Sequence, residues 1–234
     1  MEDSPRLVAP PDAAGALYFL PGQYLFKQIE DGREVAKALS SEQIARAFRE
    51  YRTDTGWIER RMLRYREQPE GNYLLSYEPA RIRNIYVETR KGEVREINVP
   101  LPALILFGKG REFYLWAAKA RRITPRTLLS HAPLPNLGGG SDLLLGKICF
   151  GKNEVPECRA DTIDAVWNLI FDAPFNADHA NGRCHSESQD VRRLLLGLAK
   201  RKARNFPAKE LLESNTSIEQ IWARATGDNS YHYF

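Results

Sequence analysis

The stretch from residue 131 to residue 150, HAPLPNLGGGSDLLLGKICF, gathers side chains that could carry out acyl transfer. It begins with His131, reaches Asn136, and after a run of glycines delivers Cys149. A thiolate is a strong nucleophile, and an amide N–H can hold the oxyanion that forms when a nucleophile attacks a carbonyl group. We therefore interpret Cys149 as a nucleophile that carries an acyl group, with Asn136 as the oxyanion donor.

The neighbours of the cysteine support this interpretation. Lys147 and Lys152 lie on either side of it and supply local positive charge, which favours a thiolate over a thiol. Glycines also flank Cys149 in a loop-like sequence, so we expect its thiol to be at least partly exposed. His131 is a weaker candidate for a catalytic base. A ring hydrogen bond that ties the loop down is the more plausible role for that histidine.

Two other functions for the cysteines compete with this one. Cysteine is among the residue types most often buried, so residue type alone favours a structural role, and for Cys149 only the loop setting reverses that preference. Cys158 and Cys184 have no such surroundings, and we expect both to be inert. A zinc site built from these two cysteines, His179 and His185 would fit none of the usual ligand spacings, so we predict no metal and no cofactor.

Composition indicates an ordinary globular chain. Of 234 residues, 43% are hydrophobic and 27% are charged, and the net charge of +4 is far from that of a nucleic-acid-binding protein. No apolar run approaches the length that spans a bilayer, and the N-terminus lacks the basic and apolar regions of a signal peptide. Three cysteines do not make a disulfide framework. We therefore expect a cytoplasmic protein with no membrane or nucleic-acid partner.

Hydrophobic periodicity predicts an α+β architecture in which a helix precedes an antiparallel meander of about four strands. After a flexible leader over 1–15, a serine N-cap at Ser40 or Ser41 and apolar residues at helical spacing predict an amphipathic helix over 41–52. The segment 55–67 is ambiguous between an edge strand and a covering segment. Strands are predicted at 16–29 (two, around Pro21-Gly22), 72–79, 81–102 (a hairpin turning at Lys91-Gly92) and 103–120 (a hairpin turning at Gly108 to Gly110).

From residue 121 the periodicity fails, and prolines and glycines predict a long ordered loop around the reactive residues. Regular structure returns at Asp161 with a helix that Pro174 ends. A polar loop follows over 175–189, and then a basic amphipathic helix over 190–205. A last helix, capped at Thr216 or Ser217, precedes an unstructured tail.

The order of these pieces resembles the ubiquitin-conjugating (E2) fold. That fold also runs from a helix through a four-stranded meander and a His-Pro-Asn loop to a Gly-x-Ile-Cys segment and a helix that bears tryptophan. The likeness extends to the bacterial E2-like proteins called prokaryotic E2 family D, which include PRTRC-system protein B. The matching pieces are T-x-L-x-H-A-P-x-P-N (Thr127 to Asn136), Gly146-Lys-Ile-Cys149, C-x-G (Cys149 to Gly151) and the helix around Trp167.

The resemblance covers about residues 16–212 and is motif-specific over 100–176. It implies an E2-like (UBC-like) catalytic domain over 16–212, followed by a C-terminal helix and tail over 213–234. One departure concerns the reactive loop. His131 and Asn136 are separated by inserted residues where an E2 has them contiguous, and Asn136 lies thirteen positions before Cys149, further than in eukaryotic E2s.

The resemblance further implies an enzyme. Cys149 would accept a ubiquitin-like protein as a thioester from an E1-like adenylating enzyme and pass it to an amine, such as a target lysine. Asn136 would be the oxyanion-stabilising residue and His131 the structural histidine. By position, the candidates that would activate the acceptor amine are Asp172, Asp178 and His179. In the first helix, Arg46, Arg49 and Arg52 would suit an acidic E1 surface, although solvent exposure is the simpler reading of that face.

Family members of this kind occur in bacterial operons with E1-like and ubiquitin-like proteins, some of them anti-phage defence systems. Two other functions stay open beside the conjugating enzyme. The chain could be a catalytically inactive binding module on the same fold, which scaffolds the E1-like or ubiquitin-like partner. It could also be a nucleic-acid-binding accessory protein, which the basic helix over 190–205 would serve, although its leucines indicate that one face packs and the basic face is solvated.

Overall fold

The computed structural model describes residues 15–30, 33–44, 61–67, 71–120, 122–138 and 146–227. The chain divides into two compact units, Met1–Gly56 and Trp57–Phe234, and this division falls inside the range 16–212 that the sequence predicts as one domain. Nearly all of the predicted leader and most of the predicted helix over 41–52 lie outside the described residues. Arg46, Arg49 and Arg52 are among them, so the predicted E1-binding face stays a prediction.

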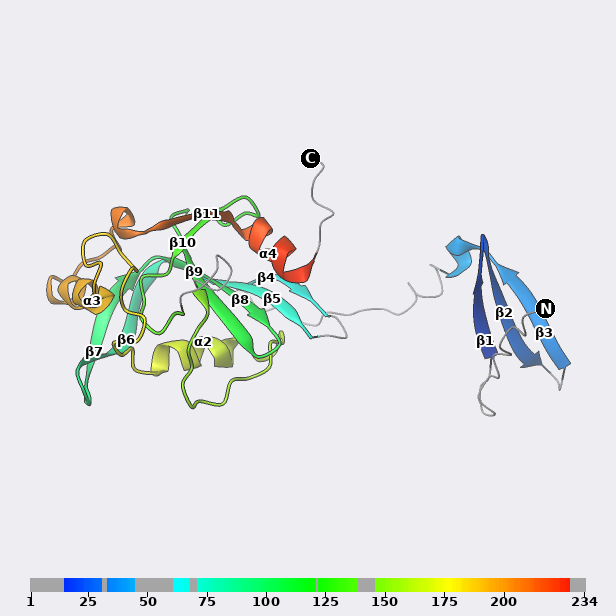
Figure 1. Cartoon of the computed structure of the whole chain (residues 1–234), viewed down its shortest axis with the longest axis horizontal. Coiled ribbons are helices and arrows are strands. Elements are labelled where there is room, and N and C mark those ends of the chain that lie inside the picture. Colours follow the sequence, from blue (N-terminus) through cyan, green and yellow to red (C-terminus); the bar gives the residue numbers. More distant parts are fainter. Residues whose placement is uncertain are drawn as a thin grey trace, which may run out of the picture. The chain divides into compact units, whose positions relative to one another are not determined.

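The first unit contains a three-stranded antiparallel sheet in the order β1-β2-β3 (Figure 1). Its strands are β1 (Gly15–Leu20), β2 (Gln23–Glu30) and β3 (Arg33–Leu39). The two strands predicted around Pro21-Gly22 are confirmed, and Gly22 has the positive φ of 80° that a tight turn needs. β3 was not predicted. Its sequence, REVAKAL, is rich in residues that are weak strand formers, so pairing with β2 provides the strand structure.

The predicted N-cap at Ser40 is present. The Ser40 hydroxyl accepts a hydrogen bond from the backbone N–H of Gln43, and the Gln43 side chain accepts one from the Ser40 N–H. This reciprocal capping box satisfies backbone donors that would otherwise lack partners at a helix start. Residues 41–44 are helical, as predicted.

The second unit is built on a six-stranded antiparallel sheet in the order β11-β10-β9-β8-β5-β4, with a separate two-stranded sheet of β6 and β7. Its strands are β4 (Met62–Arg66), β5 (Tyr73–Glu78), β6 (Arg81–Arg90), β7 (Glu93–Leu101), β8 (Ala103–Lys109), β9 (Glu112–Ala118), β10 (Leu128–His131) and β11 (Glu213–Ser217). β4 is an edge strand, one of the two predicted alternatives for its segment. The strand at 72–79 and both hairpins are also confirmed.

The sheet differs from the predicted four-stranded meander because the β6–β7 hairpin leaves it. β5 pairs directly with β8, in a register that places Tyr77 opposite Ile105. Prolines stand at the points where the chain leaves and re-enters the sheet: Pro79 precedes β6, and Pro100 and Pro102 surround the end of β7. A proline has no N–H for a central ladder, so the chain bends at these positions.

Two local predictions need correction. The β8–β9 turn is formed by Gly110 and Arg111, since β8 continues to Lys109, which pairs with Glu112. Gly108 lies inside β8 and pairs with Phe113, and a glycine is needed there because a Cβ would approach the Cys158 sulfur to 2.6 Å. The long loop predicted from residue 121 contains a strand, β10. This four-residue strand carries little periodicity of its own, and its partner β11 comes more than eighty residues later.

Among the described residues of the second unit, three α-helices pack on this framework: α2 (Ile163–Asp172), α3 (Val191–Lys200) and α4 (Ile218–Thr226), with a short 3-10 turn, η2 (Ala208–Glu210). All three α-helices were predicted, and Ser217 caps α4. α2 and the β6–β7 hairpin share one core with one face of the sheet, and α4 contributes Trp222 to a second core on the other face (Figure 1). Within the first core, the indole N–H of Trp167 donates to the Ser76 hydroxyl at 3.1 Å.

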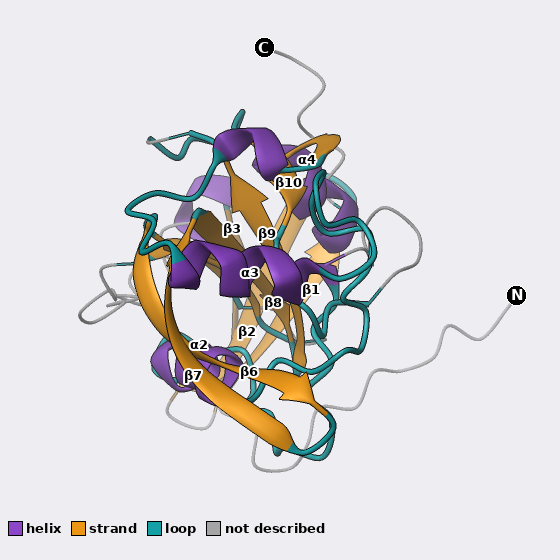
Figure 2. Ribbon diagram, turned by 90° about the vertical axis from the view of Figure 1, so that its left-hand side faces the viewer, coloured by secondary structure: helices purple, strands orange, loops and turns teal. Residues whose placement is uncertain are grey.

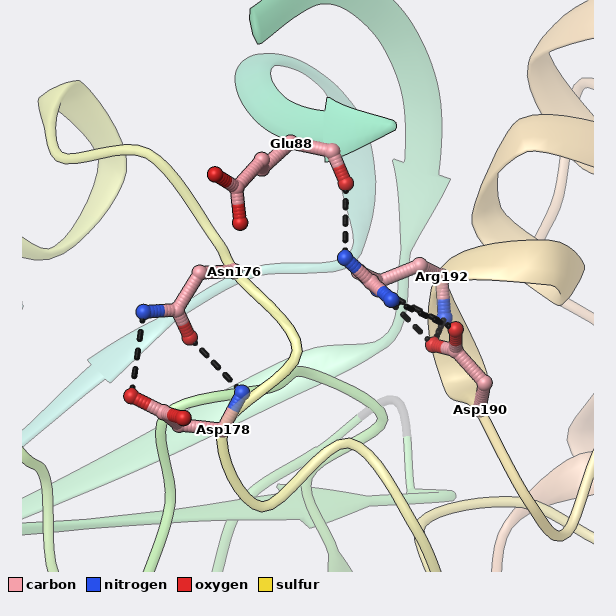
Figure 3. Close-up of polar contacts among 5 residues, drawn as sticks. All are labelled: Glu88, Asn176, Asp178, Asp190 and Arg192. Atoms are coloured by element: carbon pink, nitrogen blue, oxygen red, sulfur yellow. Dashed lines mark hydrogen bonds and ion pairs between the residues drawn. The ribbon is translucent and has the colours of Figure 1, made fainter. Parts of the chain in front are cut away.

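α3 is fixed to the two-stranded sheet at its N-terminus and along one face. The Asp190 carboxylate accepts from the backbone N–H of Arg192 and forms an ion pair with the same guanidinium, which holds the pKa of Asp190 below its usual range. Arg192 also donates to the Glu88 carbonyl at 2.7 Å (Figure 3). Behind this anchor, α3 packs against β7 (Figures 1 and 2).

Candidate active site

The segments that carry Asn136 and Cys149 lie side by side. Leu137 and Ile148 form an antiparallel bridge, and the Cys149 N–H donates to the Asn136 carbonyl over 2.8 Å. The thirteen-position spacing therefore does not keep Asn136 and Cys149 apart, because the segment from residue 146 runs antiparallel beside the Asn136 segment. Residues 139–145 lie outside the described range. The Cys149 thiol is exposed, as the sequence predicts.

The cysteine segment is held against β9. Tyr114 and Lys147 form a bridge, and the Ile148 N–H donates to the Phe113 carbonyl at 2.9 Å. Gly146 makes this approach possible, because a Cβ at that position would lie 2.6 Å from the Leu115 carbonyl oxygen. The Gly-x-Ile-Cys pattern is thus explained by the close passage of the segment beside β9.

Asn136 connects three segments of the site. Its backbone has a positive φ of 60°, a conformation that asparagine adopts more readily than most residues. Its N–H donates to the Asp178 carbonyl, and its side-chain amide donates to the Pro174 carbonyl at 3.3 Å. The side-chain carbonyl oxygen is buried and has no hydrogen-bond partner among the described residues. Asn136 therefore ties the cysteine segment to the chain that follows α2.

A cavity of about 210 Å³ lies at this junction. Apolar side chains from the sheet and from α2 line it together with Cys149, Asn136 and Asp178, whereas Asp172 and His179 are not among its lining residues. Asp178 is positioned by a turn in which its N–H donates to the Asn176 side-chain oxygen and its carboxylate accepts from the Asn176 amide at 3.1 Å (Figure 3). Of the three predicted acceptor-activating residues, only Asp178 lines the cavity together with Cys149.

His131 lies apart from this cavity, on β10. Its ring packs edge-on against Trp116, and its Nδ1 lies 3.4 Å from the Gly182 carbonyl oxygen. Burial lowers the pKa of His131, a shift that the Gly182 carbonyl partly opposes and the nearby Arg183 charge reinforces. The neutral imidazole is therefore favoured, and its contacts are those of a residue that holds the loop.

This environment predicts a pH dependence of stability. Because the folded-state pKa of His131 is lowered, the unfolded chain binds the proton first as pH falls through about 6.5. The free energy of unfolding should therefore decrease between about pH 7.5 and about pH 5.5, and the decrease should be smaller in His131→Asn. Urea unfolding of both proteins at the two pH values measures this. An equal decrease in the two proteins would contradict the assignment.

Comparison with protein families shows to which family this chain is related. The model for prokaryotic E2 family D matches residues 35–214, about three quarters of the chain. The chain belongs to this family. The match includes Asn136, Asp178 and Cys149, and it begins in β3 and ends in β11. Neither the curated proteins nor the solved structures yielded a match.

Membership of prokaryotic E2 family D associates the chain with ubiquitin-like conjugation and, in general, with E1-like and ubiquitin-like partners. The mixed helical and antiparallel architecture is compatible with an E2-like fold. No helix in the described part of the chain is long and apolar enough to cross a membrane.

The other cysteines of this family member are placed differently from Cys149. Cys158 and Cys184 are buried, as free thiols. Burial raises the pKa of Cys158 to about 12 and also raises that of Cys184, whose sulfur donates to the Glu187 carbonyl. Thiols held in the protonated form are poor nucleophiles. The described residues contain no group of histidine, cysteine and acidic side chains that could hold a metal ion.

The two lysines predicted to favour the Cys149 thiolate, Lys147 and Lys152, differ in their surroundings. Lys147 forms an ion pair with Glu112, which lowers the pKa of that carboxyl group, so its charge is largely balanced. Lys152 lines the cavity beside Cys149. Only the second lysine is placed to act on the contents of the cavity.

The sequence did not identify Arg183, whose buried side chain hydrogen-bonds to backbone carbonyls beside the candidate site. Its side chain is buried, and its guanidinium donates to the carbonyls of Leu137 and Gly138 and, at 3.3 Å, to that of His179. Burial lowers its pKa. Arg183 thus joins the strand-like segment beside Cys149 to the loop that carries Asp178. An arginine in a polar loop gives no sequence signal for such a role.

Proposed function

We propose that Cys149 accepts the C-terminal acyl group of a ubiquitin-like protein as a thioester from an E1-like enzyme. The observation that carries the proposal is the exposed Cys149 thiol in a lined cavity, on a residue whose backbone N–H donates to the Asn136 carbonyl. The Cys149 thiolate attacks the carbonyl carbon of the donor thioester. A new carbon–sulfur bond forms, the bond to the donor cysteine breaks, and that cysteine leaves as a thiolate.

In the second step an acceptor amine, such as a target lysine, attacks the Cys149 thioester. The new carbon–nitrogen bond replaces the carbon–sulfur bond, and the Cys149 thiolate leaves. Asp178 is the residue of the cavity that could take the proton from the attacking amine, because its carboxylate is exposed there and the Asn176 turn holds it. Asn136 retains a second amide N–H beside the one given to Pro174, and this N–H is the donor for the oxyanion.

One observation favours the alternative of a non-catalytic binding module. The Asn136 side chain already donates to the Pro174 carbonyl, so the amide has a structural task that an inactive relative would also need. In that case the protein would hold the ubiquitin-like or E1-like partner without forming a covalent bond. The exposed cysteine at the cavity favours the enzyme over this alternative.

The test is a charging and discharge assay with the E1-like and ubiquitin-like partners and ATP. Wild type should form a band heavier by one ubiquitin-like protein on a non-reducing gel, and thiol reductant should remove it. Asp178→Asn should charge normally but discharge to free lysine at least about tenfold more slowly. Asp172→Asn, an exposed aspartate outside the cavity, is the matched control and should behave as wild type. Absence of a band with active partners would leave the binding module.

A further inference from the structure

A groove of about 740 Å³ is lined by residues of α3 and the β6–β7 hairpin, and it shares no lining residue with the Cys149 cavity. Its walls include Ile82 on β6, Ile97 on β7, and Leu196, Gly197 and Lys200 on α3. Ile82 is 53% exposed, a large fraction for an isoleucine, and Leu196 is half-buried at the opposite wall. The groove therefore presents apolar side chains to the solvent from two elements.

Gly197 lies inside α3 at the wall of this groove, where a glycine is costly. Glycine in a helix interior is less stable than alanine by about 1 kcal/mol. A Cβ added at Gly197 would meet nothing within 4 Å, so no neighbour in the described part of the chain requires its absence. The missing side chain leaves the helix backbone open at the wall of the groove.

The end of the helix shows a second unfavourable choice. Lys202 follows the C-cap Arg201 and has a positive φ of 50°, the left-handed position that glycine normally occupies after a helix. Lys202 also lines the groove. Neither position holds the residue that would best suit the helix alone: alanine would be more stable than Gly197, and glycine would be more stable than Lys202 at a positive φ.

The rim of the groove is cationic. Arg95, Lys200 and Lys202 line it, all three exposed, against one carboxylate, Glu96, which accepts from the Asn84 amide. Lys200 and Lys202 form no ion pair with any residue in the described part. Arg95 forms one long ion pair, in which its guanidinium lies 3.8 Å from the Glu93 carboxylate. A helix C-terminus favours cations within its last turn, which accounts for Lys200 but not for a lysine beyond the helix end.

We propose that this groove binds an acidic segment of a partner protein, with one apolar side chain of that segment seated between Ile82 and Leu196 over Gly197. The cationic rim complements the acidic residues, and the apolar walls receive the anchor. A single-stranded nucleic acid fits less well, because none of the residues that line the groove is an aromatic residue on which a base could stack. This surface is independent of the chemistry proposed for Cys149.

The test uses a displayed library of random peptides of about twelve residues, selected on the full chain. Enriched sequences should carry net negative charge and at least one large apolar residue. A synthetic peptide of the enriched sequence should bind wild type at least about tenfold more tightly than Gly197→Met, and more tightly than the double variant Lys200→Glu/Lys202→Glu. Gly197→Met should melt at or above the wild-type temperature, since methionine favours the helix.

Two matched controls complete the experiment. Arg193→Glu changes an exposed cation of the same helix that does not line the groove, and Cys149→Ala changes the thiol; both should bind the peptide like wild type. Enrichment of neutral or basic peptides, or equal binding by Gly197→Met, would overturn the proposal. The absence of any enrichment would overturn it as well. So would binding of labelled single-stranded DNA to wild type, if the double variant Lys200→Glu/Lys202→Glu loses that binding.

Discussion

Cys149→Ala should abolish the reductant-sensitive adduct with the ubiquitin-like protein, and Cys149→Ser should give either no adduct or one that resists thiol reductant. The reason is that Cys149 is the exposed thiol of the cavity, whereas the other two thiols are buried. A hydroxyl at the same position forms an ester, which reductant does not cleave, and forms it slowly because an alcohol is a weaker nucleophile than a thiolate. Non-reducing and reducing gels after incubation with both partners and ATP measure the outcome.

The matched controls for this prediction are Cys158→Ala and Cys184→Ala. Their thiols have raised pKa values through burial, so their removal should leave the adduct in place. Each truncation creates a small cavity in the core, and the free energy of unfolding should fall by about 1–2 kcal/mol. Loss of the adduct in a folded Cys184→Ala variant, with the adduct kept in Cys149→Ala, would refute the assignment of the nucleophile.

Arg183→Met should lower the free energy of unfolding by about 3 kcal/mol and slow discharge of the thioester at least about tenfold. The substitution leaves the carbonyls of Leu137, Gly138 and His179 without their donor in a buried setting. These carbonyls belong to the Asn136 segment, which pairs with the Cys149 segment, and to the loop that carries Asp178, so the relative position of Cys149 and Asp178 should loosen. Urea unfolding gives the free energy, and a single-turnover discharge with free lysine gives the rate.

A purely structural role for Arg183 can be distinguished from a positioning role. At a temperature and urea concentration where the variant is fully folded, a structural role predicts the wild-type discharge rate, and a positioning role predicts a slow rate. Arg183→Lys keeps a cation that can reach some of the carbonyls, so it should recover part of the rate. The exposed Arg193→Met on α3 is the control for loss of an arginine. A wild-type rate in folded Arg183→Met would reject the positioning role.

Short-range features of this chain could be predicted because each depends on neighbouring residues. The β6–β7 hairpin alternates on both sides of Lys91-Gly92, and the turn residues fix its register. α2 and α4 have apolar residues at helical spacing, and Ser217 supplies the cap of α4. The exposure of Cys149 agrees with the loop-like sequence around it. Propensity, periodicity and capping act over a few residues, so they can be read directly from the chain.

The features that escaped prediction depend on pairs of segments far apart in sequence. β10 is a strand because β9 and β11 hydrogen-bond to it, and β11 follows more than eighty residues later in the chain. The β6–β7 hairpin leaves the sheet because β5 pairs with β8. In each case the decisive free energy comes from backbone groups that find partners as apolar surface is buried, and a local pattern does not specify which partner that will be.

The amino-acid sequence by itself determined the α+β class, the helices α2, α3 and α4, the choice of Cys149 as the candidate nucleophile, and the resemblance to prokaryotic E2 family D, which the family match confirms. Only the tertiary structure decided which residues meet that cysteine. It placed Asn136 and Asp178 at the cavity and His131 apart from it, on β10. It also placed Arg183 between the Asn136 segment and the Asp178 loop, where its guanidinium donates to carbonyls of both. The physical reason is that a loop has no regular pattern of apolar residues from which its path could be predicted. Its path depends on buried carbonyl and guanidinium groups that must form hydrogen bonds, and their partners are residues that are close in the fold but distant in the sequence.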